Sequence, residues 1–376
     1  MNVLIFADTV RSPELRHEIP HTVADPFLYG EVDGRRFAVV RSLEAARMSE
    51  VPGVEVVPHE ELGYDQLLAD GLSAGDVSLE LSRRACERFG VTYAVVPASF
   101  PLELGDTLRA AGIELTVDRG LFDDRRRVKN DAELAGIRRA QRAAEAATAA
   151  VAEMLRNSEI DGDRVLLEGE VLTSERLKAG VAAAFAANDA GADEFIVAHG
   201  PQTCIGHHMG SGAIGVGEPI TVDLWPRDRE SACFTDMTRT FVVGPVNDEL
   251  RRYHDLCKQA LEASLEAIEP GARTADVHRA AAEIFERAGE PTLLSKKPGQ
   301  VLLDGFFHSL GHGVGLEVHE EPHLGPGEGT LVAGDVIAVE PGCYRQGFGG
   351  TRLEDLILVT DSGAANFNSY PYELEP

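Results

Sequence analysis

Short apolar runs alternate with amphipathic stretches along the first third of the chain. The apolar runs are rich in β-branched residues, so they predict strands at VLIFAD, FAVVRS, VEVVP, VSLEL, YAVVPAS and IELTVD. The stretches between them predict helices at LEAARM, YDQLLADGL, SRRACERFG and PLELGDTLRAAG. Strands that alternate with helices in this way indicate a small α/β domain with a central sheet.

A charged run at residues 123–127, Asp-Asp-Arg-Arg-Arg, interrupts this pattern. It has no apolar periodicity, so we expect a linker or the lead-in to a helix there. A chain of 376 residues is also long for a single hydrophobic core. We therefore predict two domains, which cover residues 1–125 and residues 126–376.

The second part of the chain begins with a long Ala-rich helical pattern over residues 131–157. Asn130 is a candidate N-cap, and Glu133 follows at the spacing of a capping box. Further helical patterns cover residues 170–188, 248–268 and 274–289. Strands are predicted at EFIVAHG, ITVDLWP, TRTFVVG, VIAVEPG and LEDLILVT. Outer helices packed around these strands would make a second, larger domain and an α+β protein.

The charge of the chain limits its partners. Lys and Arg number 35 and Asp and Glu 62, and the resulting net charge of -27 disfavours binding to a nucleic-acid backbone. No apolar run approaches the length of a membrane span, and the first residues resemble a strand and not a signal peptide. The five cysteines are scattered without a C-x-x-C pair, which is typical of a reducing compartment. We therefore expect a cytoplasmic protein that binds neither nucleic acid nor membrane.

Two aspartates lie in apolar surroundings on a predicted hairpin, ITVDLWPRDRESACFTDMTRTF. Asp223 and Asp236 would lie on adjacent antiparallel strands and face a common site. Aspartate is disfavoured in strands, and a buried carboxylate needs a partner or a metal ion. The simpler alternative is a pair of surface aspartates. Thr238 and Arg239 are expected to hold the carboxylate of Asp236 in place.

Three histidines, His308, His312 and His319, fall within the segment HSLGHGVGLEVHE. The glycines between them disfavour a helix and would let the backbone pass close to a metal ion or a substrate. The spacing matches neither a dinucleotide-binding loop nor the H-E-x-x-H zinc helix. His207 and His208 precede a Gly-rich turn, and one of them is expected to gate a substrate pocket, although the sequence does not say which.

Two glutamates complete the candidate site. Glu340 ends the apolar run of AVEPG, and Glu354 lies in TRLEDLILV. Buried glutamates at strand ends need compensation, from a metal ion or from a salt bridge. Four carboxylates with one imidazole suit a pair of divalent first-row ions, and such a pair promotes hydrolysis. The set that predicts a metal-dependent hydrolase is Asp223, Asp236, His312, Glu340 and Glu354.

The motifs DMTRTF, HSLGHGVGLEVHE, VEPG and RLED resemble, in this order, those of the pita-bread metallopeptidases. That family contains proline-specific aminopeptidases, prolidases and methionine aminopeptidases. The segment RRVKNDAELAGIRRAQRAAEAA also looks like the start of its catalytic domain. With a small α/β domain in front, the chain is most similar to the proline-specific aminopeptidase and prolidase branch. The resemblance implies a C-terminal pita-bread fold preceded by a smaller creatinase-type domain.

The resemblance also implies how the five candidate ligands are used. Asp223 would bind one metal ion, and Asp236 and Glu354 would bridge two. His312 and Glu340 would complete the second metal site. Manganese is the metal that the family suggests first, with cobalt or zinc as alternatives.

Further residues would act on the substrate if the resemblance holds. Glu340 would also pass a proton to the leaving amine. His207 and His319 would contact the carbonyl oxygen as negative charge develops on it. The residues that would shape the pocket for proline are His308, Tyr344 and Arg352.

Hydrolysis of the peptide bond before proline is the activity that the resemblance implies. The first expectation is an Xaa-Pro aminopeptidase that acts on small peptides with proline at the second position, as a homodimer. The alternatives are an Xaa-Pro dipeptidase, a creatinase-like enzyme that acts on a small non-peptide substrate, and a non-catalytic binding module. The last two classes typically lose ligands that are all present here. The hairpin that carries Trp225 looks longer than in many relatives, on the expected substrate side.

Overall fold

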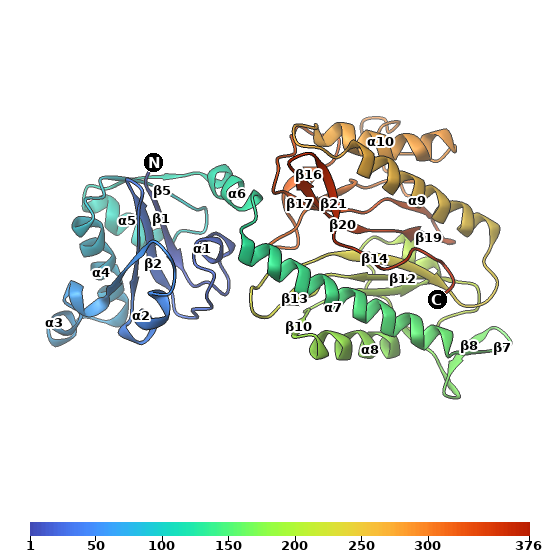
Figure 1. The fold of residues 1–376 in the computed structure, drawn as a ribbon, viewed down its shortest axis with the longest axis horizontal. Helices are drawn as coiled ribbons and strands as arrows, with labels where there is room; N and C mark the ends of the chain where they lie inside the picture. The colour runs from blue at the N-terminus through green and yellow to red at the C-terminus, as the bar shows by residue number, and fades with distance from the viewer. The chain divides into compact units, whose positions relative to one another are not determined.

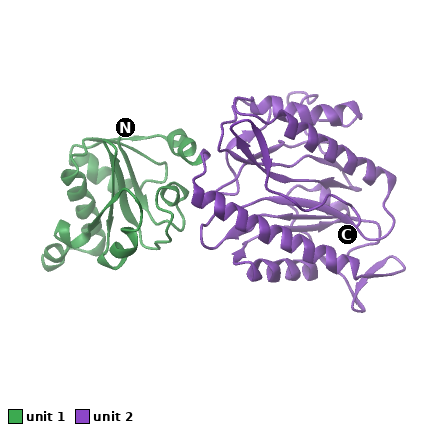
Figure 2. Cartoon of the chain, in the orientation of Figure 1, with its two compact units in different colours: residues 1–126 green, residues 127–376 purple.

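The computed structural model describes residues 1–376, and these divide into two compact units (Figure 2). Unit 1 is Met1–Arg126 and unit 2 is Arg127–Pro376.

Unit 1 is built on a mixed six-stranded sheet with the order β4-β3-β2-β1-β5-β6 (Figure 1). β1 pairs antiparallel with β2 and parallel with β5. Both faces of the sheet are buried, because Leu4 belongs to one hydrophobic cluster and its neighbours Val3 and Ile5 belong to another. The strands are β1 Val3–Ala7, β2 Phe27–Val32, β3 Arg35–Val40, β4 Val54–Pro58, β5 Tyr93–Val96 and β6 Glu114–Val117. The helices are α1 Pro13–Glu18, α2 Ser42–Met48, η1 His59–Leu62, α3 Tyr64–Ala69, α4 Ala74–Arg88, α5 Leu102–Ala110 and α6 Arg119–Arg127.

The prediction of a strand at VSLEL is wrong, because this segment lies inside helix α4. Ser73 caps the helix, and its hydroxyl accepts a hydrogen bond from the backbone N–H of Asp76 at 3.2 Å. Val77 and Leu81, one turn apart, are buried, whereas Leu79 is only half-buried. A pattern of only five residues does not distinguish the two-residue period of a strand from the 3.6-residue period of a helix. Strand β2 was not predicted, because Gly30 and Glu31 interrupt its apolar run.

The charged run at residues 123–127 is helical, because it forms the second half of α6. Phe122 anchors this helix in the core of unit 1. The Arg125 guanidinium lies 2.6 Å from a carboxylate oxygen of Glu18 and 2.7 Å from one of Glu31. Contacts of this kind hold a helix in place without a regular apolar stripe.

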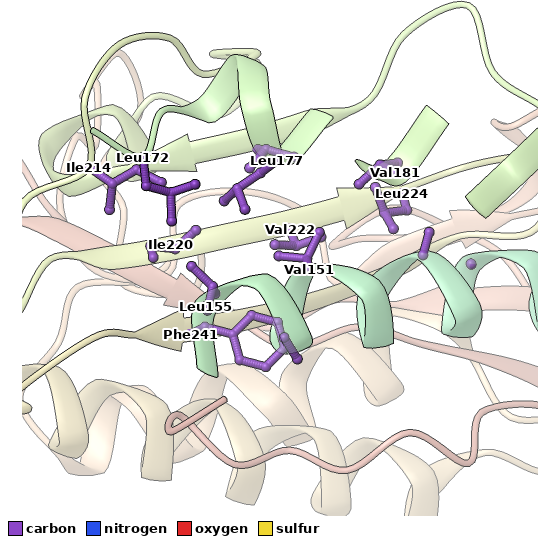
Figure 3. Close-up of a cluster of buried hydrophobic side chains, with 14 of the residues drawn as sticks. Val151, Leu155, Leu172, Leu177, Val181, Ile214, Ile220, Val222, Leu224 and Phe241 are labelled. Carbon is purple, nitrogen blue, oxygen red and sulfur yellow. The ribbon is translucent and has the colours of Figure 1, made fainter. Parts of the chain in front are cut away.

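Unit 2 contains two larger antiparallel sheets, each covered on one face by a pair of helices (Figure 1). Helices α7 and α8 cover the sheet β11-β12-β14, and helices α9 and α10 cover the sheet β16-β15-β17-β20-β21. Figure 3 shows Val151 and Leu155 of α7 and Leu177 of α8 gathered around Val222 of β12. The helices are α7 Asp131–Arg156, α8 Ser174–Ala187, η2 Gly200–Cys204, α9 Asp248–Ala267 and α10 Thr274–Arg287.

The strands of unit 2 include every one that the sequence predicts there, as β11, β12, β14, β17 and β20. The strands of the two larger sheets are β11 Ile196–His199, β12 Pro219–Leu224, β14 Met237–Val242, β15 Gly311–Gly313, β16 Glu320–Leu324, β17 Val336–Val339, β20 Asp355–Thr360 and β21 Gly363–Asn366. Smaller sheets are formed by β7 Glu159–Asp161, β8 Arg164–Leu167 and β9 Glu170–Val171, by β10 Ala190–Gly191 and β13 Arg227–Asp228, and by β18 Gly342–Arg345 and β19 Gly349–Arg352.

The predicted capping box at the start of α7 is confirmed. The side chain of Asn130 accepts from the backbone N–H of Glu133, and the side chain of Glu133 accepts from that of Asn130, both at 2.9 Å. The helices expected at 248–268 and 274–289 are α9 and α10. The helix expected at 170–188 begins later, at Ser174, because residues 170–171 form β9. None of the helices combines the length and apolar character that crossing a membrane requires.

The two larger sheets of unit 2 meet at Glu354. The backbone N–H of Glu354 donates to the carbonyl of Thr238 at 3.1 Å, which joins the start of β20 to β14. Each sheet has one face against its helices, so residues on the other faces turn toward the junction. Polar side chains at these strand ends are therefore brought together from distant parts of the sequence.

Candidate metal centre

All five candidate ligands line one cavity of about 420 Å³ in unit 2. They come from both sheets, and each lies in a strand or next to the end of one. Asp223 lies in β12, Asp236 precedes β14, His312 lies in β15, Glu340 follows β17 and Glu354 precedes β20. Strands β12 and β14 are antiparallel neighbours as the sequence predicts, with Asp223 paired to Thr238, but Asp236 lies one residue before the start of β14.

Three of these residues form the centre of the site. Ligand atoms of Asp236, His312 and Glu354 all lie within 4.8 Å of one another, and the three residues are buried. The Nε2 atom of His312 is 3.8 Å from Oδ2 of Asp236 and 3.8 Å from Oε1 of Glu340. Four potential ligands are therefore close enough to share cations.

The orientation of His312 suits a metal ligand. Its Nδ1 lies 3.1 Å from the carbonyl oxygen of Gly313 and can only donate to it, so Nε2 carries the lone pair. Burial, and then the neighbouring His319, lowers the pKa of His312 to about 4, which keeps the ring neutral. A lone pair that faces carboxylate oxygens is repelled by them unless a cation lies between.

The buried carboxylates of the site also require a cation to compensate their charge. Burial raises the pKa of Asp236 well above its usual value, and the negative charges of Glu354 and Asp223 raise it further. Burial, followed by the charge of Glu340, raises the pKa of Glu354 in the same direction. Burial also raises the pKa of Glu340 to about 7. Oxygen-rich ligation with one imidazole suits divalent first-row ions, so these residues fit the metals that the sequence predicts.

Asp223 is placed differently from the other four. It lines the cavity, but its Oδ2 accepts a short hydrogen bond from Nη2 of Arg352. That contact fixes the Arg352 side chain beside Asp223 and leaves Oδ1 of Asp223 without a hydrogen bond.

The three residues expected around proline form a chain that leads away from the cavity. Arg352 lines the cavity, whereas Tyr344 and His308 do not. Nδ1 of His308 donates to the carbonyl of Ser309 at 2.7 Å, so Nε2 accepts from the Tyr344 hydroxyl at 3.1 Å. Tyr344 in turn lies 3.5 Å from Nη1 of Arg352. His308 and Tyr344 are thus placed to orient Arg352.

The prediction that Thr238 and Arg239 hold Asp236 is wrong, because both hold Glu354. The Thr238 hydroxyl donates to Oε2 of Glu354 at 2.7 Å, and Nη1 of Arg239 donates to the Glu354 carbonyl at 2.8 Å. The cause is the register across the two sheets, which pairs Thr238 with Glu354. Asp236 instead accepts a hydrogen bond from the next residue in the chain, the backbone N–H of Met237, at 3.1 Å.

The glycines on either side of His312 lie close to the backbone of neighbouring strands. A Cβ atom at Gly311 would lie 1.9 Å from the carbonyl oxygen of Ala338, and one at Gly313 would lie 2.3 Å from that of Glu321. These glycines therefore let β15 pack closely against its neighbours, β16 and β17.

The structure separates the two adjacent histidines. His207 lines the cavity, and Nδ1 of His208 accepts a hydrogen bond from the backbone N–H of Gly210 at 3.0 Å. His319 also lines the cavity, with its ring 4.2 Å from that of His312 between centroids. Burial, followed by the charge of His207, lowers the pKa of His319, so its neutral ring has one N–H to donate.

Sequence reasoning missed several residues of the cavity wall. The clearest is Trp225, the only tryptophan, whose hairpin the sequence places on the substrate side without naming Trp225 itself as a site residue. The spacing of two residues from Asp223 is a signal that could have identified Trp225, because alternate residues of an extended chain face the same side. The other residues of the wall that were missed are Glu194, Ile196, Met209 and Val318.

Known proteins resemble the chain over most of its length. The sequence model of metallopeptidase family M24 matches residues 135–361. The "Probable dipeptidase PepE" of Mycobacterium tuberculosis is 30% identical over 282 residues, which cover 74% of this chain and 68% of that protein. The Xaa-Pro dipeptidase of Pyrococcus furiosus is 34% identical over 181 residues, 48% of each chain.

The fold agrees with these sequence matches. The crystal structure of the prolidase from Pyrococcus horikoshii superimposes with a TM-score of 0.76 at 25% identity, over 99% of this chain and 95% of that one. The predicted α+β fold, a pita-bread domain preceded by a smaller α/β domain, is thereby confirmed. The chain belongs to metallopeptidase family M24, as its motifs predict.

Proposed function

We propose that this protein is a metal-dependent Xaa-Pro dipeptidase, which hydrolyses the bond before proline and releases two free amino acids. The observation that carries the proposal is the convergence of Asp236, His312 and Glu354, within 4.8 Å, in a cavity that Arg352 also lines. The sequence by itself puts an aminopeptidase first. The names of the curated relatives favour the dipeptidase, which is the alternative.

We assign two divalent ions to this site, with manganese first and cobalt or zinc as alternatives. Asp236 and Glu354 would bridge them, Asp223 would bind one, and His312 and Glu340 would complete the other. Two divalent metal ions, when bound, would supply a nucleophilic water near neutral pH and polarise the carbonyl group that the water attacks. Oδ1 of Asp223 is available for this purpose, because Arg352 engages only Oδ2.

The remaining residues of the cavity fit the substrate. Glu340 lines the cavity and can pass a proton to the proline nitrogen as the bond breaks. His319 and His207 face the cavity, where an N–H can donate to the carbonyl oxygen as negative charge develops on it. Arg352 offers a buried positive charge to the carboxylate of the second residue.

A peptide panel tests the activity. The protein is freed of metal with a chelator, reloaded with manganese and assayed on Ala-Pro, Ala-Pro-Ala and Ala-Ala. We expect rapid hydrolysis of Ala-Pro, little of the other two, and no activity before reloading. Efficient cleavage of Ala-Pro-Ala would instead identify an aminopeptidase. Inactivity on both proline peptides, with two ions per chain found by elemental analysis, would refute the proposal. Light scattering of the same sample tests the homodimer that the family implies.

A further inference from the structure

The proposed chemistry does not use several residues of the cavity wall, among them Glu194, Ile196 and Trp225. In the β11–β12 ladder, Ile196 pairs with Asp223. Glu194 lies two residues before Ile196 and Trp225 two residues after Asp223, both just outside the two strands, and the antiparallel register extended by two residues would set them opposite each other. Alternate residues of a strand face one side, and all four residues line the cavity. The wall therefore runs from a candidate metal ligand to a carboxylate about 7 Å further along the strands.

This stretch of wall combines apolar side chains with one carboxylate. Ile196 is buried, and the indole of Trp225 and the thioether of Met209 line the cavity with it. Glu194 is exposed and makes no hydrogen bond or salt bridge within the chain. A long cationic side chain matches such a surface, because its methylene stem packs on apolar groups while its charged head stays in water. An indole face adds attraction for the cation.

Two opposite charges on the cavity wall can orient a dipeptide. Arg352, which lines the cavity and contacts Asp223, is positive and suits the free carboxylate of the second residue. Proline has an uncharged ring, so the only side chain that varies in an Xaa-Pro substrate is that of the first residue. Glu194 can therefore contact either that side chain or the α-amine that all such substrates share.

We propose that Glu194 and Trp225 form a subsite that selects lysine or arginine as the first residue of the substrate. This inference rests on the proposed dipeptidase function. A shared α-amine sits at the backbone, next to the scissile bond and the metal ligands. The carboxylate of Glu194 is two residues further out than Asp223, at the distance of a long side chain's end.

The test compares Lys-Pro with Nε-acetyl-Lys-Pro, which has the same backbone and stem but no charge. The quantity measured is the ratio of the two kcat/KM values, with manganese and at low salt. We expect about fivefold preference for Lys-Pro in the wild type, the range of an exposed ion pair. The ratio should fall to about one in Glu194→Gln, and Glu194→Lys should prefer Glu-Pro to Lys-Pro. Asp193→Asn is the matched control, because Asp193 is an exposed neighbouring carboxylate outside the cavity wall and its loss should leave the ratio unchanged.

Three results would overturn the inference. If Glu194→Gln lowers both kcat/KM values by the same factor, the ratio is preserved, and Glu194 instead contacts the α-amine or supports the structure of its loop. If the wild type does not discriminate between the two peptides, the subsite does not read charge. If the wild type hydrolyses Ala-Pro but neither lysine peptide, the subsite excludes long side chains. Failure to hydrolyse any Xaa-Pro dipeptide, Ala-Pro included, would refute the dipeptidase function itself and with it this subsite.

Discussion

Replacing Asp236 by asparagine should make the metal-free protein more stable and the metal-loaded protein less so. Asp236 is only 5% exposed, and burial together with the charges of Glu354 and Asp223 raises its pKa well above the usual value. The folded-state pKa therefore lies above the unfolded-state pKa, so this group destabilises the fold increasingly as pH rises between the two. Asparagine carries no charge, and its Oδ1 can still accept from the N–H of Met237.

The expected gain follows from removing a buried carboxyl group that must either carry an uncompensated charge or take up a proton on folding. Such a group destabilises a protein by about 2 kcal/mol, so metal-free Asp236→Asn should unfold at a temperature roughly 4 to 8 °C higher than metal-free wild type. Manganese at a thousand times its dissociation constant would stabilise the wild type by about 4 kcal/mol. The variant has lost a proposed bridging ligand and should gain much less.

Scanning calorimetry at pH 7.5, with chelator or with manganese, measures both effects, and Asp355→Asn is the control. Asp355 is also fully buried, but it accepts from the buried guanidinium of Arg239 at 2.9 Å. Neutralising it leaves that cation unpaired, which should destabilise the protein by about 3 kcal/mol with or without metal. The reasoning would be refuted if metal-free Asp236→Asn melted below metal-free wild type, or if manganese stabilised both proteins equally.

Three other changes have separate readouts. His319→Ala should lower kcat about 100-fold through loss of a donor to the carbonyl oxygen, while manganese content measured by elemental analysis stays constant; loss of the metal would make His319 a ligand. Thr238→Val removes the 2.7 Å hydrogen bond to Glu354 and should weaken manganese binding about tenfold in an equilibrium titration, and unchanged affinity would contradict its supporting role. Nδ1 of His199 lies 2.7 Å from Oε2 of Glu218, and this contact raises the pKa of His199. The pair therefore stabilises the folded protein at pH 6, and this stabilisation is lost as the pH rises through the folded-state pKa of His199. Glu218→Gln should therefore lower the urea-measured stability by about 1 kcal/mol at pH 6 and by less at pH 9, and an equal loss at both values would exclude a titrating pair.

Most of the secondary structure in unit 2 and the chemical class of the site could be predicted from the sequence. A capping box and a helical period are local signals, so α7 was predicted to within a residue of its end. Carboxylates inside apolar strands are conspicuous for the opposite reason, because folding alone does not explain them. That is why all five candidate ligands could be named before the structure placed them around one cavity.

Only the tertiary structure decided which of these groups meet. Two examples are the pairing of Thr238 with Glu354 and the contact of Arg352 with Asp223, because both join strands that lie more than a hundred residues apart in the chain. VSLEL became a helix for a related reason, since burial of its one-turn pair outweighed an alternating pattern. Periodicity reports the face on which a side chain lies. Its neighbour on that face is set by the packing of whole sheets, which local sequence does not encode.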